Sequence, residues 1–300
     1  MKRLQALLSD LHPDPVNPVN PVQLNSLVGV FARAMKVKEI ESQRNPTFRM
    51  FLKILKGQGI QKHGLAFLSG PKQVGEVLKD FPDRCAGLVL TKKQDVPKEG
   101  MPDQVTVYRL GIDLFRDIDV HGTNQPILLI RVDPLPEWSD KHWPSGCNLF
   151  VPFQDPTNVG AVIRSAAAFG VSRVVILKEA AHPFHHKSLR AAGSAILRVS
   201  IWEGPSIKEL GKTKAPLITL SPEGEDIARY KFPTTFGLLP GLEGPGLPDN
   251  LRHAQSLAIP MEPGMESINA ALATGIALYV WRSTIERNNG ILARPGAKGL

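Results

Sequence analysis

The sequence predicts an α/β protein in which a small α/β domain precedes a C-terminal domain built on a mostly parallel sheet. Three observations support this prediction. Strand-like and helix-like segments alternate between residues 148 and 287, the pattern of parallel strands joined by crossover helices. A shorter alternation runs between residues 64 and 132. The segment between them, residues 133–147, is rich in proline turn signals and is expected to be an interdomain linker.

The composition excludes several classes of protein. A hydrophobic content of 42% and a charged content of 21% are typical of a soluble globular chain, and 300 residues suffice for two domains. No apolar run approaches the roughly 20 residues that span a bilayer, and the run after Met1 is too short for a signal peptide. Cys85 and Cys147 lie far apart, which favours reduced thiols in the cytoplasm.

Positive charge is concentrated near the N-terminus. Residues 1–62 hold ten Lys/Arg against four acids, so they contribute +6 of the net charge of +8. Basic side chains that neutralise phosphates bind nucleic acid without sequence preference, so this region is a candidate RNA contact. A solvated helical face explains the same charges equally well.

The N-terminal third divides into an extension and a small domain. Residues 13–22 repeat Pro-Val-Asn and predict an extended linker within an N-terminal extension of residues 1–42, where residues 24–35 look helical. Residues 43–132 form the small α/β domain. Its first helix, residues 47–56, has the start signal Asn45-Pro46. The further elements expected are Leu65–Ser69, Pro71–Asp80, Gly87–Thr91, Val105–Arg109, Ile112–Ile118 and Pro126–Val132.

The C-terminal domain is expected to span residues 145–287, followed by a flexible Gly/Asn-rich tail at residues 288–300. Its predicted strands are Asn148–Phe153, Arg173–Leu177, Val199–Trp202, Leu217–Leu220, Thr235–Leu239 and Leu257–Pro260, and its predicted helices are residues 159–169, 187–193 and 267–287.

The most informative segment is Asp155-Pro-Thr-Asn158-Val-Gly160-Ala-Val-Ile-Arg164, which leads from a turn into an alanine-rich helix. Arg164 is the one cation on this helix, which we expect to be buried. Burying a charge is costly unless the charge is paired or used, so Arg164 is either a structural anchor to a carboxylate or a functional group.

Two later segments place polar groups at the ends of strands or helices, where loops carry chemistry on a rigid scaffold. Residues 236–247 are an apolar run ending in a glycine-rich loop that holds Glu243. Residues 258–271 are a short strand, a Pro/Gly loop, and then Ser267 and Asn269 at the expected start of a long helix. The apolar residues of that helix have the spacing of one buried face: Ile268, Ala271, Leu272, Gly275, Ile276 and Tyr279.

These three segments, with residues 189–195 between them, resemble the SpoU-type (TrmH-like) ribose 2′-O-methyltransferases of the SPOUT superfamily over about residues 145–285. They match the family patterns N-x-G-A-x-x-R, G-x-E-G-x-G and I-P-M…S-(L/I)-N-x-(A/S). The chain departs from many relatives at Leu242, where an amide side chain is missing, and at Ala271, which lacks a hydroxyl. Arg164, Glu243, Ser267 and Asn269 all remain, which disfavours a non-catalytic RNA-binding paralogue.

The resemblance implies a deep trefoil knot, S-adenosyl-L-methionine as cofactor without a metal, and a homodimer whose site lies at the subunit interface. It also implies that the first domain is a ribosomal-protein-like RNA-binding domain. Ribosomal RNA is the favoured substrate, while a transfer-RNA ribose or an RNA base nitrogen remains the alternative. The sequence does not identify the target nucleotide, or distinguish ribosome maturation from antibiotic resistance.

Site residues follow from the same motifs. The family's catalytic arginine corresponds to Arg164; because guanidinium stays protonated, we expect it to clamp the target phosphate and 2′-oxygen rather than act as base. Glu243 is expected to pair with a cation such as Arg164, or else to face water. Ser267 is either a helix N-cap or a site residue. We expect Asn269 to orient the arginine or the ribose, and Asn158 to bond substrate or the facing subunit. The positions expected to hold the cofactor are Leu239, Gly241, Ile259, Met261 and Ile268.

Two other readings are disfavoured. His182, His185 and His186 invite a metal site, but no cysteine or carboxylate lies nearby at ligand spacing. The loop Gly241-Leu-Glu-Gly-Pro-Gly does not have the spacing of the dinucleotide-binding fingerprint.

Overall fold

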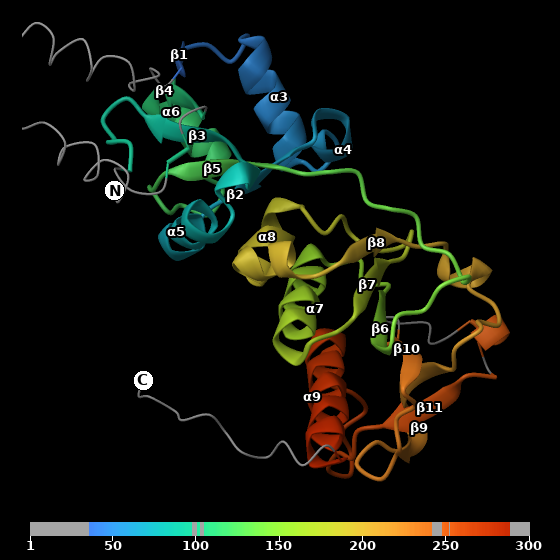
Figure 1. The fold of residues 1–300 in the computed structure, drawn as a ribbon. Coiled ribbons are helices and arrows are strands. Elements are labelled where there is room, and N and C mark those ends of the chain that lie inside the picture. The colour runs from blue at the N-terminus through green and yellow to red at the C-terminus, as the bar shows by residue number, and fades with distance from the viewer. Residues whose placement is uncertain (1–35, 98–100, 103–104, 242–247, 252, 289–300) are drawn as a thin grey trace, which may run out of the picture.

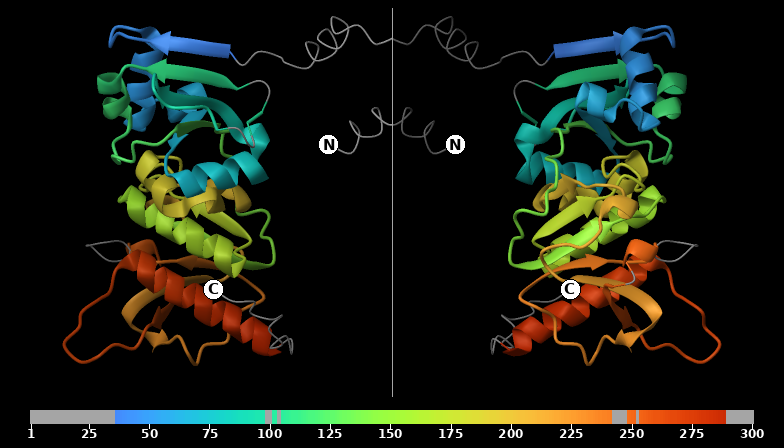
Figure 2. Two further views of the ribbon diagram at one scale, coloured as in Figure 1. Left: turned by 90° about the vertical axis from the view of Figure 1, so that its left-hand side faces the viewer. Right: turned by 90° about the vertical axis from the view of Figure 1, so that its right-hand side faces the viewer.

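The computed structural model describes residues 36–97, 101–102, 105–241, 248–251 and 253–288. Two sheets form the cores of two stacked units, with helices between them (Figure 1). Figure 2 shows the order of the stack: the first unit, then helices α8 and α7, then the long helix α9. No helix in the described ranges is long and apolar enough to cross a membrane.

The first unit is a mixed five-stranded sheet in the order β1-β4-β3-β5-β2. Strands β1, β4 and β3 run parallel, and β5 runs antiparallel to both β3 and β2. Its elements are β1 (Lys36–Ile40), α3 (Pro46–Leu55), α4 (Ile60–His63), β2 (Leu65–Leu68), α5 (Pro71–Asp80), η1 (Pro82–Arg84), β3 (Cys85–Thr91), β4 (Thr106–Leu110), α6 (Ile112–Ile118) and β5 (Ile127–Arg131).

The helices of this unit begin where the sequence signals them. The Asn45 side chain accepts a hydrogen bond from the Thr47 backbone N–H at 2.9 Å, and Pro46 occupies the first position of α3. Phe48, Phe51 and Ile54 then bury one face of α3. Helix α5 begins with Pro71 and buries Val74, Val77 and Leu78 at the same spacing.

The first strand corrects the expected N-terminal extension. Lys36–Ile40 pairs in parallel with β4 as the edge of the first sheet, so the folded chain begins before residue 42. The segment Lys-Val-Lys-Glu-Ile did not indicate a strand because four of its five residues are exposed and only Ile40 is buried. Its neighbour on the sheet supplies the backbone pairing that local pattern cannot show. The helix expected over residues 24–35 lies outside the described residues.

The second sheet has six strands in the order β11-β9-β10-β6-β7-β8, and all its pairings are parallel. This confirms the predicted parallel sheet. Its elements are β6 (Gly146–Val151), α7 (Pro156–Phe169), β7 (Arg173–Ile176), α8 (His186–Ala192), η2 (Gly193–Arg198), β8 (Ile201–Glu203), η3 (Ile207–Glu209), β9 (Leu217–Asp226), β10 (Thr235–Leu239), η4 (Asp249–Leu251), β11 (Gln255–Ala258) and α9 (Ala270–Asn288). The trefoil knot stays a prediction.

The strand order reverses between β6 and β10. From β6 the chain proceeds outward through β7 and β8, whereas β9, β10 and β11 occupy the other half of the sheet. In an open parallel sheet, ligands bind outside the carboxyl ends of the strands at such a switch point. The segments that follow β6 and β10 therefore flank the position where a ligand site is expected.

The expected interdomain linker is packed against the second sheet. The rings of Trp138 and Trp143 both contact that of Phe150 on β6, at centroid distances of 5.4 and 5.7 Å. The Trp138 backbone N–H donates to the Glu203 carbonyl at 2.7 Å, which extends the sheet beyond β8. The aromatic side chains thus attach this segment to the sheet.

Side chains also join the two units directly. Ser194 in η2 donates to the Glu76 carboxylate on α5 at 2.6 Å, and Arg198 pairs with Asp80 at the end of α5. The Arg198 guanidinium lies 5.0 Å from the centre of the Phe81 ring. These contacts position the first unit on the α8–η2 side of the second.

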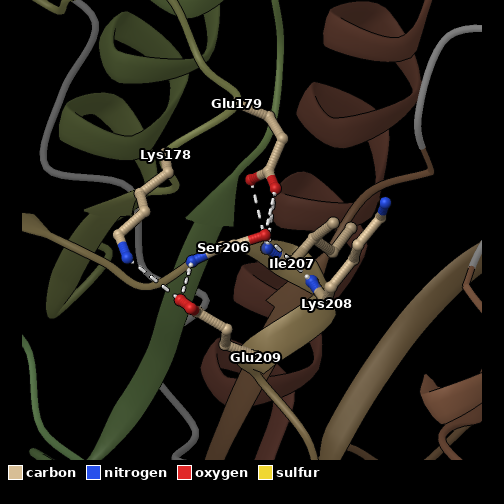
Figure 3. A network of polar contacts seen from close by, with 6 residues as sticks. All are labelled: Lys178, Glu179, Ser206, Ile207, Lys208 and Glu209. Carbon is tan, nitrogen blue, oxygen red and sulfur yellow. Dashed lines mark hydrogen bonds and ion pairs between the residues drawn. The ribbon is translucent and has the colours of Figure 1, made fainter.

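The loops after β7 and β8 are held together by a polar network (Figure 3). Ser206 and the Ile207 backbone N–H both donate to the Glu179 carboxylate, while the Glu209 carboxylate accepts from the Ser206 backbone N–H at 3.0 Å. Lys178 pairs with Glu209 at 3.1 Å. The polar side chains joined by dashed lines in Figure 3 all pair with one another. We therefore interpret the network as structural: it holds the start of η3 against the loop that follows β7.

Candidate functional site

Helix α7 carries the first motif and starts at the carboxyl end of β6. The Asp155 side chain accepts a hydrogen bond from the Thr157 backbone N–H at 2.8 Å, Pro156 follows, and Gly170 ends the helix with φ 71°. Gly160 is needed for packing, because a Cβ atom there would lie 2.2 Å from the Ser188 carbonyl on α8. The glycine of the motif therefore lets α7 and α8 approach closely.

The first and third motifs meet through two asparagines. Asn269 Nδ2 donates to Asn158 Oδ1 at 3.2 Å. From this contact, helices α7 and α9 run parallel and pack against each other along their length. A Cβ atom on Gly275 would lie 3.5 Å from Ser165 Oγ, and the rings of Phe169 and Tyr279 are 6.1 Å apart. Parallel packing of the two helices thus fixes the motif residues at their N-terminal ends.

Asn269 is itself the N-cap of α9, which corrects the expectation that it lies inside the helix. Its side-chain oxygen accepts from the Leu272 backbone N–H at 3.0 Å, and α9 begins at Ala270. Ser267 lies before the helix and is exposed, so it is not the cap. The helix was expected from residue 267, but the Pro/Gly loop extends to residue 269. Apolar spacing marks a helix start less sharply than a capping side chain does.

Arg164 is exposed, contrary to the expectation of a buried cation. The buried residues of α7 are Val159, Gly160, Val162, Ile163 and Ala166. Arg164 instead shares a face with Thr157, Ala161 and Ala168, about a third of a turn away from Asn158. Alanine-rich composition suggested burial, but in this helix the alanines also cover the open face. Arg164 therefore does not share a face with the Asn158–Asn269 contact.

The expected cofactor residues lie at or just beyond the carboxyl ends of two strands in the same half of the sheet. Leu239 is buried at the end of β10. Gly241 follows, and a Cβ atom there would lie 3.3 Å from the Leu220 carbonyl of β9. Ile259 and Met261 follow β11 and are half-buried, as is Ile268 before α9. Glu243 lies outside the described residues, so its predicted pairing stays a prediction.

A cluster of histidines lies at the junction of the two units. His186 Nδ1 is 3.2 Å from His121 Nε2, and the ring of His185 is 4.4 Å from that of His186. Burial lowers the pKa of His182 and of His186 to about 4, so the rings are neutral at pH 7. Within the described part of the chain no three potential ligands are grouped for a metal ion. Sequence spacing could not reveal His121 as a member, because it comes from the other unit.

Comparison with known proteins agrees with this geometry. The SpoU rRNA Methylase family matches residues 149–279, which include the first and third motifs. The chain carries a SpoU methylase domain. The solved rRNA methyltransferase of Sinorhizobium meliloti is similar over 83% of this chain and 99% of its own, with a TM-score of 0.69 and 22% identity. An AdoMet-bound structure of an rRNA methyltransferase from the same organism gives 0.67. This likeness supports the SPOUT-type α/β fold.

Two curated relatives align over most of this chain. "Ribosomal RNA small subunit methyltransferase G 2" of Syntrophobacter fumaroxidans is 50% identical over 81% of this chain, but over only 49% of its own length. The chain thus spans about half of that relative. The 23S rRNA (guanosine(2553)-2′-O)-methyltransferase RlmP of Bacillus subtilis is 25% identical over 81% of this chain and 98% of its own. Both alignments are therefore longer than the match to the family, which covers residues 149–279.

Proposed function

We propose that this protein is an S-adenosyl-L-methionine-dependent RNA 2′-O-ribose methyltransferase that acts on ribosomal RNA. The observation that carries the proposal is the Asn158–Asn269 hydrogen bond, which joins the first and third SpoU motifs. Of the two helices that it connects, α7 follows β6, one of the two strands between which the strand order of the parallel sheet reverses.

The residues at the ends of β10 and β11 fit an adenosine-bearing cofactor. The close approach of Gly241 to the Leu220 carbonyl leaves backbone groups free of a covering side chain, and Ile259, Met261 and Ile268 offer half-buried apolar surface. When bound, S-adenosylmethionine supplies a sulfonium methyl whose leaving group is a neutral thioether. The protein is then required chiefly to position the ribose hydroxyl. The AdoMet-bound S. meliloti rRNA methyltransferase supports this choice.

Arg164 has the role of clamping the target phosphate and the 2′-oxygen. Its exposed position leaves the guanidinium available to a polyanion, and guanidinium binds phosphate through a bidentate fork. Because it lies on a face of α7 different from that of Asn158, Arg164 completes a site formed with a second copy of the chain. Asn269, Ser267 and Glu243 belong to the half-site contributed by the other copy.

The surface for that second copy is the open side of α9 and α7. Leu272 and Tyr279, expected on a buried face, are 57% and 60% exposed within this chain. They are seven residues apart and so lie on the same side of α9. Ala161 and Ala168 lie beside Arg164 on α7, where small side chains permit close approach. Exposed apolar side chains on α9, and small ones beside Arg164 on α7, fit a homodimer interface.

Ribosomal RNA is favoured over transfer RNA because both curated relatives described above are named for ribosomal RNA. The name of the longer relative does not assign a target to the half that this chain spans. The test is to map 2′-O-methyl positions in 16S and 23S RNA from cells with and without the gene. Loss of one 2′-O-methyl group supports the proposal. The proposal would be excluded if cells without the gene kept every 2′-O-methyl group of ribosomal RNA and lost instead a methyl group on transfer RNA or on an RNA base.

A further inference from the structure

Helix α3 has a face on which every charged residue is basic. Arg49, Lys53 and Lys56 are exposed and spaced at i, i+4 and i+7, so they form one row. The opposite face is buried through Phe48, Phe51, Ile54 and Leu55, and the helix contains no acidic residue. Among the large exposed apolar side chains of the described residues, none belongs to α3. This face thus offers charge without the apolar anchors that a protein partner needs.

The row is not explained by stability of the helix. In the part of the chain that the structure describes, the salt bridges involve other residues, so these three cations are not neutralised. Lys53 and Lys56 lie near the C-terminal end of α3, where a cation complements the helix dipole. Arg49 lies near the N-terminal end, where a cation is disfavoured. A ligand of opposite charge accounts for all three.

The two ends of α3 have different surroundings. At the N-terminal end of α3, an open cavity of about 470 Å³ is lined by Arg44 and by two acids, Glu41 and Asp113, each of which is paired with a cation. At the other end, Gly57 lies against the second unit, since a Cβ atom there would be 3.2 Å from His185 Cδ2. Lys187, two residues after His185, is exposed on the first turn of α8. Exposed cations therefore also continue toward the SpoU domain.

We propose that the row Arg49, Lys53 and Lys56 holds the sugar–phosphate backbone of the RNA substrate and leads it toward the SpoU domain. The proposal rests on the proposed function and assigns the docking surface for that reaction. Unpaired cations arranged along one helix bind phosphates irrespective of sequence. The selection of the methylated nucleotide is then left to the second unit.

The test compares two triple variants of the full-length protein. Arg49→Gln/Lys53→Gln/Lys56→Gln removes the row, and glutamine keeps a comparable helix propensity. Lys72→Gln/Lys79→Gln/Lys93→Gln removes the same charge from exposed positions of the same unit. Filter binding of unmodified 16S and 23S transcripts over a salt series, with thermal unfolding as a check of folding, measures both. We expect the α3 variant to lose about 2 units of salt slope and about tenfold or more in affinity at low salt. The control should stay within about twofold of wild type.

Equal binding by the two variants, whether both match wild type or both are weakened alike, overturns the assignment to α3 while leaving the methyltransferase function intact. Methylation by the wild-type protein, measured in the same reactions, distinguishes failure of the docking surface from failure of the proposed methyltransferase function. A wild-type protein that neither binds nor methylates either transcript would overturn the function and the docking surface together.

Discussion

Asn269 connects α9 to α7 across 111 positions of the chain: its amide donates to Asn158 on α7, while its oxygen caps α9. One side chain thus has a structural and a positioning role. These roles separate in two variants. Asn269→Ala removes both and should lower the free energy of unfolding by about 1 kcal/mol. Asn269→Asp keeps the cap but places a carboxylate against the Asn158 oxygen, so stability should be retained while methyl transfer is lost. Denaturant unfolding and a methylation assay decide. Equal activity of Asn269→Asp and wild type would remove the asparagine pair from the site.

Arg164→Ala should reduce methyl transfer on the order of 100-fold or more, because it removes a contact to charge in the transition state. Cofactor affinity should stay within a few-fold, and stability should change by less than about 0.5 kcal/mol, since the side chain is exposed. Arg164→Lys should fail nearly as badly because ammonium lacks the bidentate fork. Mixing Arg164→Ala with Asn269→Asp should restore part of the activity in heterodimers. A mixture no more active than its components would contradict a site shared between two chains.

Leu272→Glu combined with Tyr279→Glu should convert the proposed homodimer to a monomer, because two charges would enter the interface that we assign to the exposed apolar side chains of α9. Light scattering measures the mass directly. The exposed residues Val37 and Val120, both in the first unit, supply the control when changed to glutamate. A dimer that survives the α9 changes but not the control changes would place the interface on the first unit.

Gly160→Ala should destabilise the protein by about 1–3 kcal/mol, because the added methyl group meets the Ser188 carbonyl on α8. Gly75→Ala provides a matched control within another helix, α5. No atom lies within 4 Å of a Cβ there, so the variant should gain about 0.5–1 kcal/mol through higher helix propensity. Urea denaturation of both variants compares the two glycines. Similar changes for both would mean that close packing of α7 on α8 is not the reason for Gly160.

Stability should fall between pH 6.5 and pH 4 because of the buried histidines. Burial lowers the pKa of His182 to about 4, whereas the unfolded chain has an ordinary value near 6.5. The unfolded state then binds more protons in this interval, so the free energy of unfolding decreases as the pH is lowered. His182 Nδ1 also accepts from the Phe184 backbone N–H at 3.1 Å, and protonation would abolish that bond. The loss should be on the order of 1 kcal/mol at pH 5.

Denaturant midpoints at pH 7, 6 and 5 measure this effect. His182→Asn keeps an acceptor and does not titrate, so its stability should depend less steeply on pH than that of wild type. Parallel pH profiles for the two proteins would assign the acid sensitivity to other groups.

Much of the fold was determined by local sequence. Asn45-Pro46 defines a helix start that the structure confirms, since a capping side chain and a proline act within one turn. The sequence predicts a turn at Asp155-Pro156 and a helix from residue 159, whereas α7 already begins at Pro156 with Asp155 as its cap. The alternation of segments predicted the parallel second sheet, and strand Thr235–Leu239 has the expected bounds. The order of three motifs likewise indicated the SpoU domain, because each combines residue types with fixed spacing.

Only the tertiary structure decided what depends on distant partners. Lys36–Ile40 is a strand because β4 supplies its pairing, although its own side chains are mostly exposed. Arg164 is exposed because α8 and α9 cover other faces of α7, and no local pattern specifies which face a neighbour will bury. Asn269 meets Asn158, and His121 meets His186, through contacts between segments far apart in the chain. Sequence thus determined the elements and the chemistry they carry, whereas their mutual contacts determined which side chains meet, because packing between elements is a non-local interaction.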